Sequence, residues 1–272
     1  ALFNALDDTY RVVCDFYGIR PVETAVFVFA DQDRHKAFAE TLTGQELSSW
    51  AWASGGNGML LFCPYAPGND YRESPRQLPE CTAHEYSHCV THRVLGNAAM
   101  PMWLDEGLAM HCGALVRDRE VEDNDLALTR MWTAKQILPL RAVTERNTFY
   151  DEQIAPYAYT QAYAMVRYLI SELQRDGLLE LLNNLKHGGN FNAAMEDVWG
   201  GNVDAFYEDW LVATERRLRT RSGREVLLQV WVEPGNEDRT GHAMESLVRA
   251  IRWDEERFGL ELDLDRFMIV AV

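Results

Sequence analysis

The sequence lacks a long apolar run and has few basic residues for its length. No apolar stretch reaches about 18 residues, the length that a spanning helix needs, so we predict no transmembrane segment. Lys and Arg number 26 against 42 Asp and Glu in 272 residues, which gives a formal net charge of −16. This excess of acid argues against nucleic acid and anionic membranes as partners, because both repel a negative surface.

Cysteine pairs with metal-binding spacing are also missing. The chain has five cysteines and no C-x-x-C pair, which argues against a cysteine zinc site. We expect small buried residues, and one or two disulfides stay open if the protein is exported. The five are Cys14, Cys63, Cys81, Cys89 and Cys112.

No signal peptide is visible, but this says little about the compartment. A helical pattern starts at once, over residues 2–17, so the sequence opens like a segment of a longer chain. The compartment therefore stays open, with an exported or cell-envelope location favoured over a cytoplasmic one.

The sequence contains one motif that indicates a metal site. It is His84-Glu85-Tyr86-Ser87-His88, of the form H-E-x-x-H. On a helix, residues four apart share a face, so His84 and His88 can present two imidazoles to one metal ion. A second helical pattern supplies a carboxylate, Glu106, with seventeen residues between it and His88. Two histidines and one glutamate, with a fourth position open for water, are a catalytic zinc set. We therefore expect one Zn²⁺ per chain.

The neighbours of these three ligands have predicted roles of their own. Zinc lowers the pKa of a bound water to about 7, and Glu85 would take the water's proton during attack on a carbonyl and pass it to the leaving nitrogen. Asp105 either orients a ligand or is a plain surface acid. His92 shares the histidine face, but three stacked histidines on one straight helix converge poorly on one ion, so Glu106 is preferred as the third ligand. His111 is expected to pack or to hydrogen-bond.

The pattern along the chain predicts an α+β fold. Residues 1–120 form an α+β half that holds the metal motif, with a buried strand at 26–29 and a second strand at 59–62. Residues 121–221 are nearly all helical and complete the catalytic domain, and 222–272 are an appended strand–helix–strand segment. The predicted helices cover 2–17, 34–42, 80–95, 102–115, 124–137, 157–174, 177–186, 190–198, 202–221 and 243–257. The last two strands are predicted at 226–232 and 267–272.

The motif together with Trp103-Leu104-Asp105-Glu106-Gly107-Leu108-Ala109 resembles the gluzincin metallopeptidases, which include thermolysin and the aminopeptidase N family. It is most similar to their smaller peptidase MA-like members, over the element order of about residues 1–220. The resemblance implies a thermolysin-like zincin catalytic domain followed by a helical lobe, and a peptide or protein as substrate. Residues 158–164 extend it, because they resemble the family's Pro-Tyr-Glu-Lys-Gly-Phe-Ala segment. By position Tyr159 would be the oxyanion donor; one more aromatic in a Tyr-rich helix is the other interpretation, and Tyr163 is the reserve candidate.

The chain also departs from the aminopeptidase branch of that group. The Gly-Ala-Met-Glu-Asn segment, whose glutamate there grips a free amino terminus, is absent. Residues 56–60, Gly-Asn-Gly-Met-Leu, take its place. We predict that this stretch, with Gly58 and Met59, is an edge strand that pairs with an extended peptide backbone. It supplies no carboxylate, so the resemblance implies peptide hydrolysis without implying aminopeptidase activity.

Residues 222–272 resemble a segment of bacterial aminopeptidase N, where that segment precedes the metal helix. They bring no predicted catalytic residue. The sequence thus supports three hypotheses: a zinc-dependent peptidase with Glu85 as general base, a catalytically inactive zincin-like peptide-binding module, or an aminopeptidase proper. The intact Glu85 favours the first, because a merely structural zinc site needs no general base.

Overall fold

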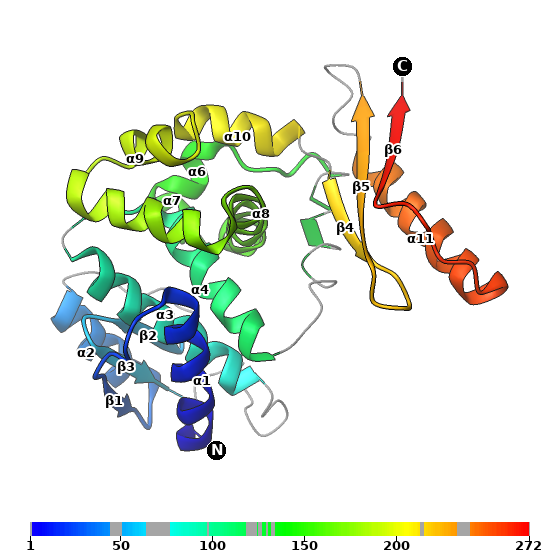
Figure 1. Ribbon diagram of the computed structural model, residues 1–272. Coiled ribbons are helices and arrows are strands. Elements are labelled where there is room, and N and C mark those ends of the chain that lie inside the picture. The colour runs from blue at the N-terminus through cyan, green and yellow to red at the C-terminus, as the bar shows by residue number, and fades with distance from the viewer. Residues whose placement is uncertain are drawn as a thin grey trace. The chain divides into compact units, whose positions relative to one another are not determined.

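The fold divides into two compact units, each described here by itself. The computed structural model describes residues 2–43, 51–63, 77–96, 98–117, 124, 127–128, 130–131, 134–212, 215–232 and 240–271. The first unit comprises residues 1–123 and 138–203, and the second 124–137 and 204–272. Each unit contains its own small sheet among helices (Figure 1). This mixed and mostly helical architecture confirms the predicted α+β class.

The sheet of the first unit has three strands in the order β1-β3-β2. They are β1 (Ala25–Val28), β2 (Ala53–Gly56) and β3 (Met59–Phe62). The central strand β3 runs parallel to β1 and antiparallel to β2. Asn57 and Gly58 form the turn between β2 and β3 with positive φ angles of 49° and 72°, the backbone that a two-residue Asn-Gly hairpin needs.

The strands of this sheet differ from the prediction at two places. We predicted a buried strand at 26–29, but β1 is an edge strand, and Phe27 and Val28 are 38% and 55% exposed. Strand β2 was not predicted, because Ala-Ser-Gly-Gly has none of the β-branched or aromatic residues that mark strands. Its pairing with β3 outweighs this low propensity.

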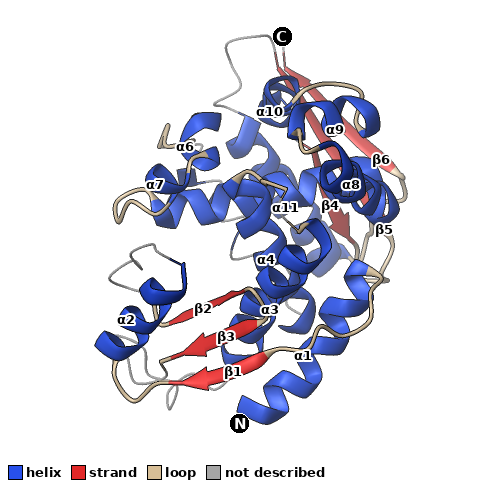
Figure 2. Ribbon diagram, turned by 90° about the vertical axis from the view of Figure 1, so that its left-hand side faces the viewer, coloured by secondary structure: helices blue, strands red, loops and turns tan. Residues whose placement is uncertain are grey.

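Four helices form at the places the sequence predicts. They are α1 (Leu2–Tyr17), α2 (Gln32–Thr43), α3 (Gln77–Leu95) and α4 (Met102–Arg117). Helices α2 and α3 contact this sheet, and α1 and α4 pack on α3. Strand β2 lies against α3, and α1 packs on α3 from another side (Figure 2). Gly55 makes the first contact possible: a Cβ atom there would stand 2.0 Å from the carbonyl oxygen of Glu85.

The later described helices of the first unit are α6 (Leu140–Thr144), α7 (Arg146–Phe149), α8 (Ala155–Gly188) and α9 (Phe191–Val198). Of these, α6 and α8 pack on α4, and α7 and α9 pack on α8. Helix α8 crosses α4 so closely that a Cβ atom on Gly107 would come within 2.5 Å of the Ala162 carbonyl oxygen. At Gln174 the backbone of α8 leaves the helical region, with φ 56° and ψ 175°. This kink falls at the end of the predicted helix 157–174 and before the one predicted at 177–186.

The second unit contains α10 (Val203–Val212), β4 (Glu215–Arg219), β5 (Glu225–Val232), α11 (Thr240–Phe258) and β6 (Arg266–Ala271). Strand β5 is central, antiparallel to β4 and parallel to β6. The strand, helix and strand predicted after residue 222 thus all form. The helix predicted over 202–221 is wrong in its second half: α10 ends at Val212, and residues 215–219 form β4, which pairs with β5. In the helix predicted at 124–137, residues 125–126, 129 and 132–133 lie outside the described residues, and the last turn is wrong, because 134–137 are turn and irregular structure.

The core of the second unit lies between its sheet and α11. Six buried residues form it: Leu218, Val226, Leu228, Val230, Met244 and Ile251. They alternate along the strands and recur at helical spacing along α11, so each element contributes one apolar face.

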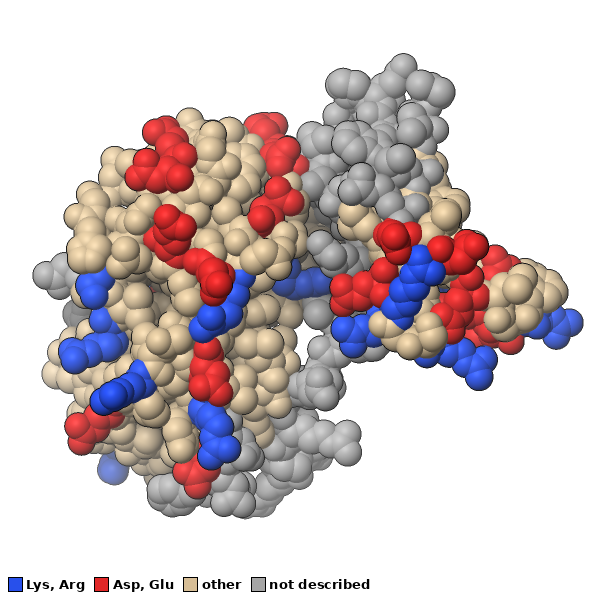
Figure 3. All heavy atoms as spheres, in the orientation of Figure 1, with Lys and Arg blue, Asp and Glu red and all other residues tan. Residues whose placement is uncertain are grey.

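Two predictions about composition can be checked against the structure. All five cysteines are free, and four of them are buried, as expected for small core residues. None of the described helices combines the length and apolar character that crossing a membrane requires. The face drawn in Figure 3 carries both acidic and basic side chains among the described residues of the first unit.

Candidate metal centre

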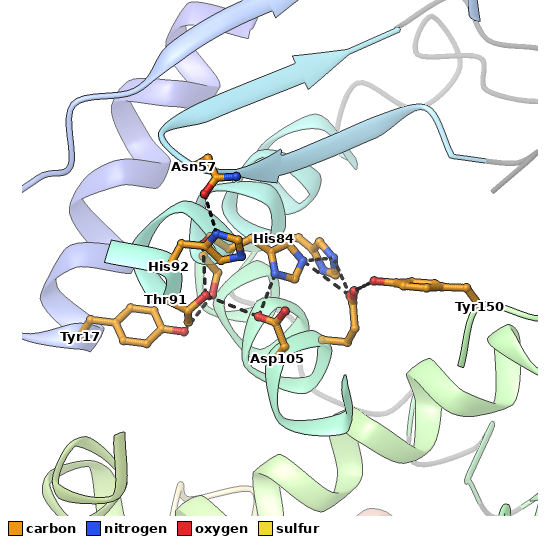
Figure 4. A network of polar contacts seen from close by, with 10 residues as sticks. Tyr17, Asn57, His84, Thr91, His92, Asp105 and Tyr150 are labelled. Atoms are coloured by element: carbon orange, nitrogen blue, oxygen red, sulfur yellow. Dashed lines mark hydrogen bonds and ion pairs between the residues drawn. The ribbon is translucent and has the colours of Figure 1, made fainter. Parts of the chain in front are cut away.

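The predicted ligands come together where α3 meets α4. His84 and His88 stand one helical turn apart on α3, and Glu106 comes from α4. Glu106 Oε2 lies 3.2 Å from His84 Nε2 and 3.6 Å from His88 Nε2, and the two nitrogens are 3.4 Å apart. All three candidate ligand atoms lie within 4.8 Å of one another. Figure 4 shows this cluster with Asp105 and Tyr150 beside it.

The protonation of His88 is set by Asp105. His88 Nδ1 lies 3.0 Å from Asp105 Oδ1, and the Thr91 hydroxyl donates to the same oxygen at 3.4 Å. A carboxylate can only accept, so Nδ1 carries the proton, and in the neutral ring Nε2 keeps a free lone pair. That lone pair faces the cluster. A metal ligand whose other nitrogen is bound to a carboxylate is the usual arrangement around zinc.

The charges around the cluster favour a cation there. Glu106 Oε2 is buried and has no hydrogen-bond partner among the described residues. Burial disfavours charge on His88, yet the Asp105 and Glu106 carboxylates outweigh it and raise the pKa of His88 well above its usual value. For Glu106, burial is likewise outweighed by the two histidines, which hold its pKa well below its usual value. The donor set of two imidazole nitrogens and one carboxylate oxygen suits a divalent metal ion.

Glu85 lies beside the cluster and is buried, with 8% of its surface exposed. Burial raises the pKa of its carboxyl above the usual value, and the neighbouring His84 and His88 work against this rise. A carboxylate with a raised pKa is a better proton acceptor than one in water, which suits general-base chemistry near neutrality.

Two tyrosines lie near the cluster, and only Tyr159 is predicted from the sequence. The ring of Tyr159, on α8, lies 6.2 Å from the His84 ring and 5.1 Å from that of Phe149. Tyr150, at the end of α7, donates its hydroxyl to Glu106 Oε1. Burial, and next the Glu106 charge, raise the pKa of both phenols well above the usual value. No motif marks Tyr150 in the sequence; its only signal is an aromatic pair with Phe149 ahead of the Tyr-rich helix.

The other candidate residues lie away from the three ligands. His92 is exposed, and its Nδ1 lies 3.2 Å from Asn57 Oδ1, which ties α3 to the β2–β3 turn. His111 packs on Phe16, with ring centroids 5.0 Å apart. Tyr163 is buried with Arg167 Cζ 5.7 Å from its ring centroid.

The predicted edge strand at Gly58 and Met59 needs correction. Met59 begins β3, the central strand, where it is paired with Ala25 on one side and Gly56 on the other. The backbone of Met59 is therefore already paired within the sheet on both sides, and Gly58 lies in the turn. Among the described strands, the free edge on the α3 side belongs to β2, so a substrate strand would have to pair there.

Comparison with known proteins agrees with this geometry. The family described as the Peptidase MA superfamily matches residues 79–215, just over half of the 272 residues. This stretch contains the whole H-E-x-x-H motif, Glu106 and both tyrosines. The chain belongs to the peptidase MA superfamily.

A second similarity covers a short segment only. Aminopeptidase N of Escherichia coli strain K12 is 64% identical over 53 residues, and that of Caulobacter vibrioides is 62% identical over the same length. Aminopeptidase N of Haemophilus influenzae is 60% identical over 53 residues. Each match covers 20% of this chain and 6% of the relative. No solved structure matches the chain. The family and the aminopeptidase N segment, both predicted from the sequence, are thus confirmed.

Proposed function

We propose that this protein is a zinc-dependent peptidase whose first unit is a thermolysin-like zincin domain. The observation that carries the proposal is the convergence of His84 Nε2, His88 Nε2 and Glu106 Oε2 on one buried point, within 4.8 Å of one another. A buried carboxylate oxygen with no donor, facing two imidazoles, calls for a cation. Because the chain belongs to a peptidase superfamily, the reaction that we propose is hydrolysis of a peptide bond.

The residues around the three ligands have complementary roles. When bound, zinc supplies Lewis-acid chemistry and lowers the pKa of water to about 7. The Glu85 carboxylate takes the proton of the attacking water and returns it to the leaving nitrogen, so that an amine departs rather than an amide anion. Asp105 keeps the proton of His88 on Nδ1 and so directs Nε2 inward.

The developing oxyanion on the substrate carbonyl needs a donor. The Tyr159 ring lies 6.2 Å from the His84 ring, and the raised pKa of the Tyr159 phenol keeps it protonated and able to donate. The free edge of β2 lies over α3 and can pair with an extended peptide backbone, which would lay a scissile bond across the site.

Metal content and one variant test this proposal together. Purified protein should contain about one zinc per chain, and chelation should remove zinc and peptide cleavage together. Glu85→Gln keeps the size of the side chain and removes the base, so it should retain zinc and cleave a mixed peptide library at least about 100-fold more slowly. Equal cleavage by the wild type and Glu85→Gln would end the proposal. Zinc binding without any cleavage would favour the inactive peptide-binding module instead.

The aminopeptidase N segment supports a second candidate, an aminopeptidase proper. It carries none of the residues of the cluster, and the chain spans only 6% of those relatives. Peptides with free and with acetylated amino termini separate the two candidates. Equal cleavage of both forms excludes an aminopeptidase, and loss of cleavage on acetylation favours one.

A further inference from the structure

The two oxygens of Glu106 face different partners. Oε1 accepts a hydrogen bond from the Tyr150 hydroxyl. Oε2 faces His84 Nε2 at 3.2 Å and His88 Nε2 at 3.6 Å, and it has no hydrogen-bond donor among the described residues. The carboxylate is thus held with one oxygen committed to a phenol and the other turned to the metal centre.

We propose that Tyr150 is a positioning residue that fixes Glu106 as a one-oxygen metal ligand. The proposal rests on the proposed function, because it assumes that the cluster holds a metal ion. A free carboxylate can bind a metal through one oxygen or through both, and it can swing between these modes. A phenol that donates to Oε1 disfavours the second mode, because it occupies a lone pair of that oxygen and lowers its ability to bind a metal.

The same principle already applies to His88. Asp105 binds its Nδ1 and directs Nε2 inward, and Tyr150 binds Oε1 and directs Oε2 inward. Outer partners of this kind orient metal ligands, and losing one typically weakens metal binding about 10- to 100-fold. Removing the Tyr150 hydroxyl would also leave a buried carboxylate oxygen without its donor, which is unfavourable in itself.

Tyr150 is itself held from two sides. It ends the short helix α7, where its backbone N–H donates to the Arg146 carbonyl oxygen at 3.1 Å. Arg146 Cζ lies 4.8 Å from the centroid of the Tyr150 ring, and the Phe149 ring meets it edge-on at 5.4 Å. A ring clamped between a cation and an aromatic edge keeps its hydroxyl in one place.

The test must separate Tyr150 from Tyr159, because both phenols lie near Glu106. Three variants that each lose one phenol hydroxyl distinguish the two roles. They are Tyr150→Phe, Tyr159→Phe and, as a matched control elsewhere on α8, Tyr157→Phe. The readout is the zinc dissociation constant, measured by competition with a chromophoric chelator. Turnover of a peptide library is then measured with increasing zinc.

Tyr150→Phe should raise the zinc dissociation constant about 10- to 100-fold. Tyr159→Phe should raise it less, and Tyr157→Phe should change it less than about three-fold. Excess zinc should restore turnover to Tyr150→Phe and not to Tyr159→Phe. An unchanged dissociation constant in Tyr150→Phe overturns the proposal; if turnover falls all the same, Tyr150 contacts the substrate instead. Wild-type protein that binds no zinc would overturn the proposed function, and this proposal with it.

A second variant keeps the proposal testable if Tyr150→Phe does not fold. Arg146→Ala removes the stacked cation from an exposed position and leaves the phenol in place. It should weaken zinc binding about two- to five-fold, in line with the strength of an exposed cation–π contact. A zinc dissociation constant equal to that of the wild type would then count against the proposal.

Discussion

Asp105 and His88 form a carboxylate–imidazole pair, with 3.0 Å between Oδ1 and Nδ1. The pair fixes which nitrogen of His88 is free, so it connects a residue that touches no metal to the proposed zinc affinity. Asp105→Asn keeps the shape and removes the charge. We expect it to raise the zinc dissociation constant about 10-fold or more, measured by chelator competition.

Thr91→Val is the matched control for that experiment. The Thr91 hydroxyl donates to the same Asp105 oxygen over a longer distance, 3.4 Å, so its loss should change zinc affinity less than about three-fold. Zinc binding by Asp105→Asn as tight as in the wild type would show that Asp105 is a plain surface acid, the other interpretation of the sequence.

Gly107 is a glycine because two helices cross at its Cα. A Cβ atom there would lie 2.5 Å from the Ala162 carbonyl oxygen and 2.5 Å from Val166 Cγ2. Gly107→Ala should therefore lower the free energy of unfolding by about 1 to 3 kcal/mol or more, since α4 and α8 must separate. Chemical denaturation measures this. Gly188→Ala is the control: no atom lies within 4 Å of that Cβ position, so the protein should be unchanged or up to about 1 kcal/mol more stable.

Gln174 holds a backbone conformation that suits glycine alone. Its φ of 56° with ψ of 175° interrupts α8, and a side chain in this region costs about 1 to 3 kcal/mol. Gln174→Gly should raise the free energy of unfolding by about 1 kcal/mol, less than the full strain because glycine is freer when unfolded. Gln174→Ala should bring no gain, and a gain from Ala equal to that from Gly would mean that the backbone is not strained.

The candidate metal cluster could be predicted from the sequence because its geometry is local. His84 and His88 are fixed by one helical turn, and Glu106 by a motif on the next helix, so few long-range contacts are needed to bring them together. The helix boundaries of α1, α3 and α4 follow from periodicity for the same reason.

The parts that were missed depend on pairing or on distant contacts. Strand β2 is Ala-Ser-Gly-Gly and forms only because β3 and α3 flank it. Strand β4 has a Glu-Arg-Arg-Leu-Arg sequence that is compatible with a helix, and it is extended only because it pairs with β5. Tyr150 stands 44 residues from Glu106, and no local pattern predicts a hydrogen bond over such a separation.

His111 predicts a pH dependence of stability that is independent of the metal centre. Burial, and next the charge of Arg167, lower its pKa from 6.5 to about 4. As the pH falls, His111 therefore binds a proton near pH 6.5 in the unfolded chain but only near pH 4 in the folded protein. The stability linked to His111 is present above pH 6.5 and is lost as the pH falls from 6.5 to about 4. His111→Gln should remove about 2 to 3 kcal/mol of the loss measured by denaturation between pH 7 and pH 4. Equal losses in the variant and the wild type would contradict the assignment.

Gly55 connects the sheet to the proposed catalytic base. A Cβ atom at this position would stand 2.0 Å from the carbonyl oxygen of Glu85 and 3.0 Å from its Cα, so Gly55→Ala must push β2 away from α3. Because β2 offers the free edge for substrate and Glu85 the base, a shift of about 1 Å should lower kcat/KM about 100-fold, with zinc content retained. Ser54→Ala is the control, because the Ser54 hydroxyl lies 3.5 Å from Nε2 of His35, a residue of α2 outside the cluster. This variant should keep kcat/KM within about three-fold of the wild-type value. Loss of zinc in Gly55→Ala would instead mean that the contact supports the fold of α3 as a whole, and unchanged kcat/KM would mean that substrate does not pair with β2.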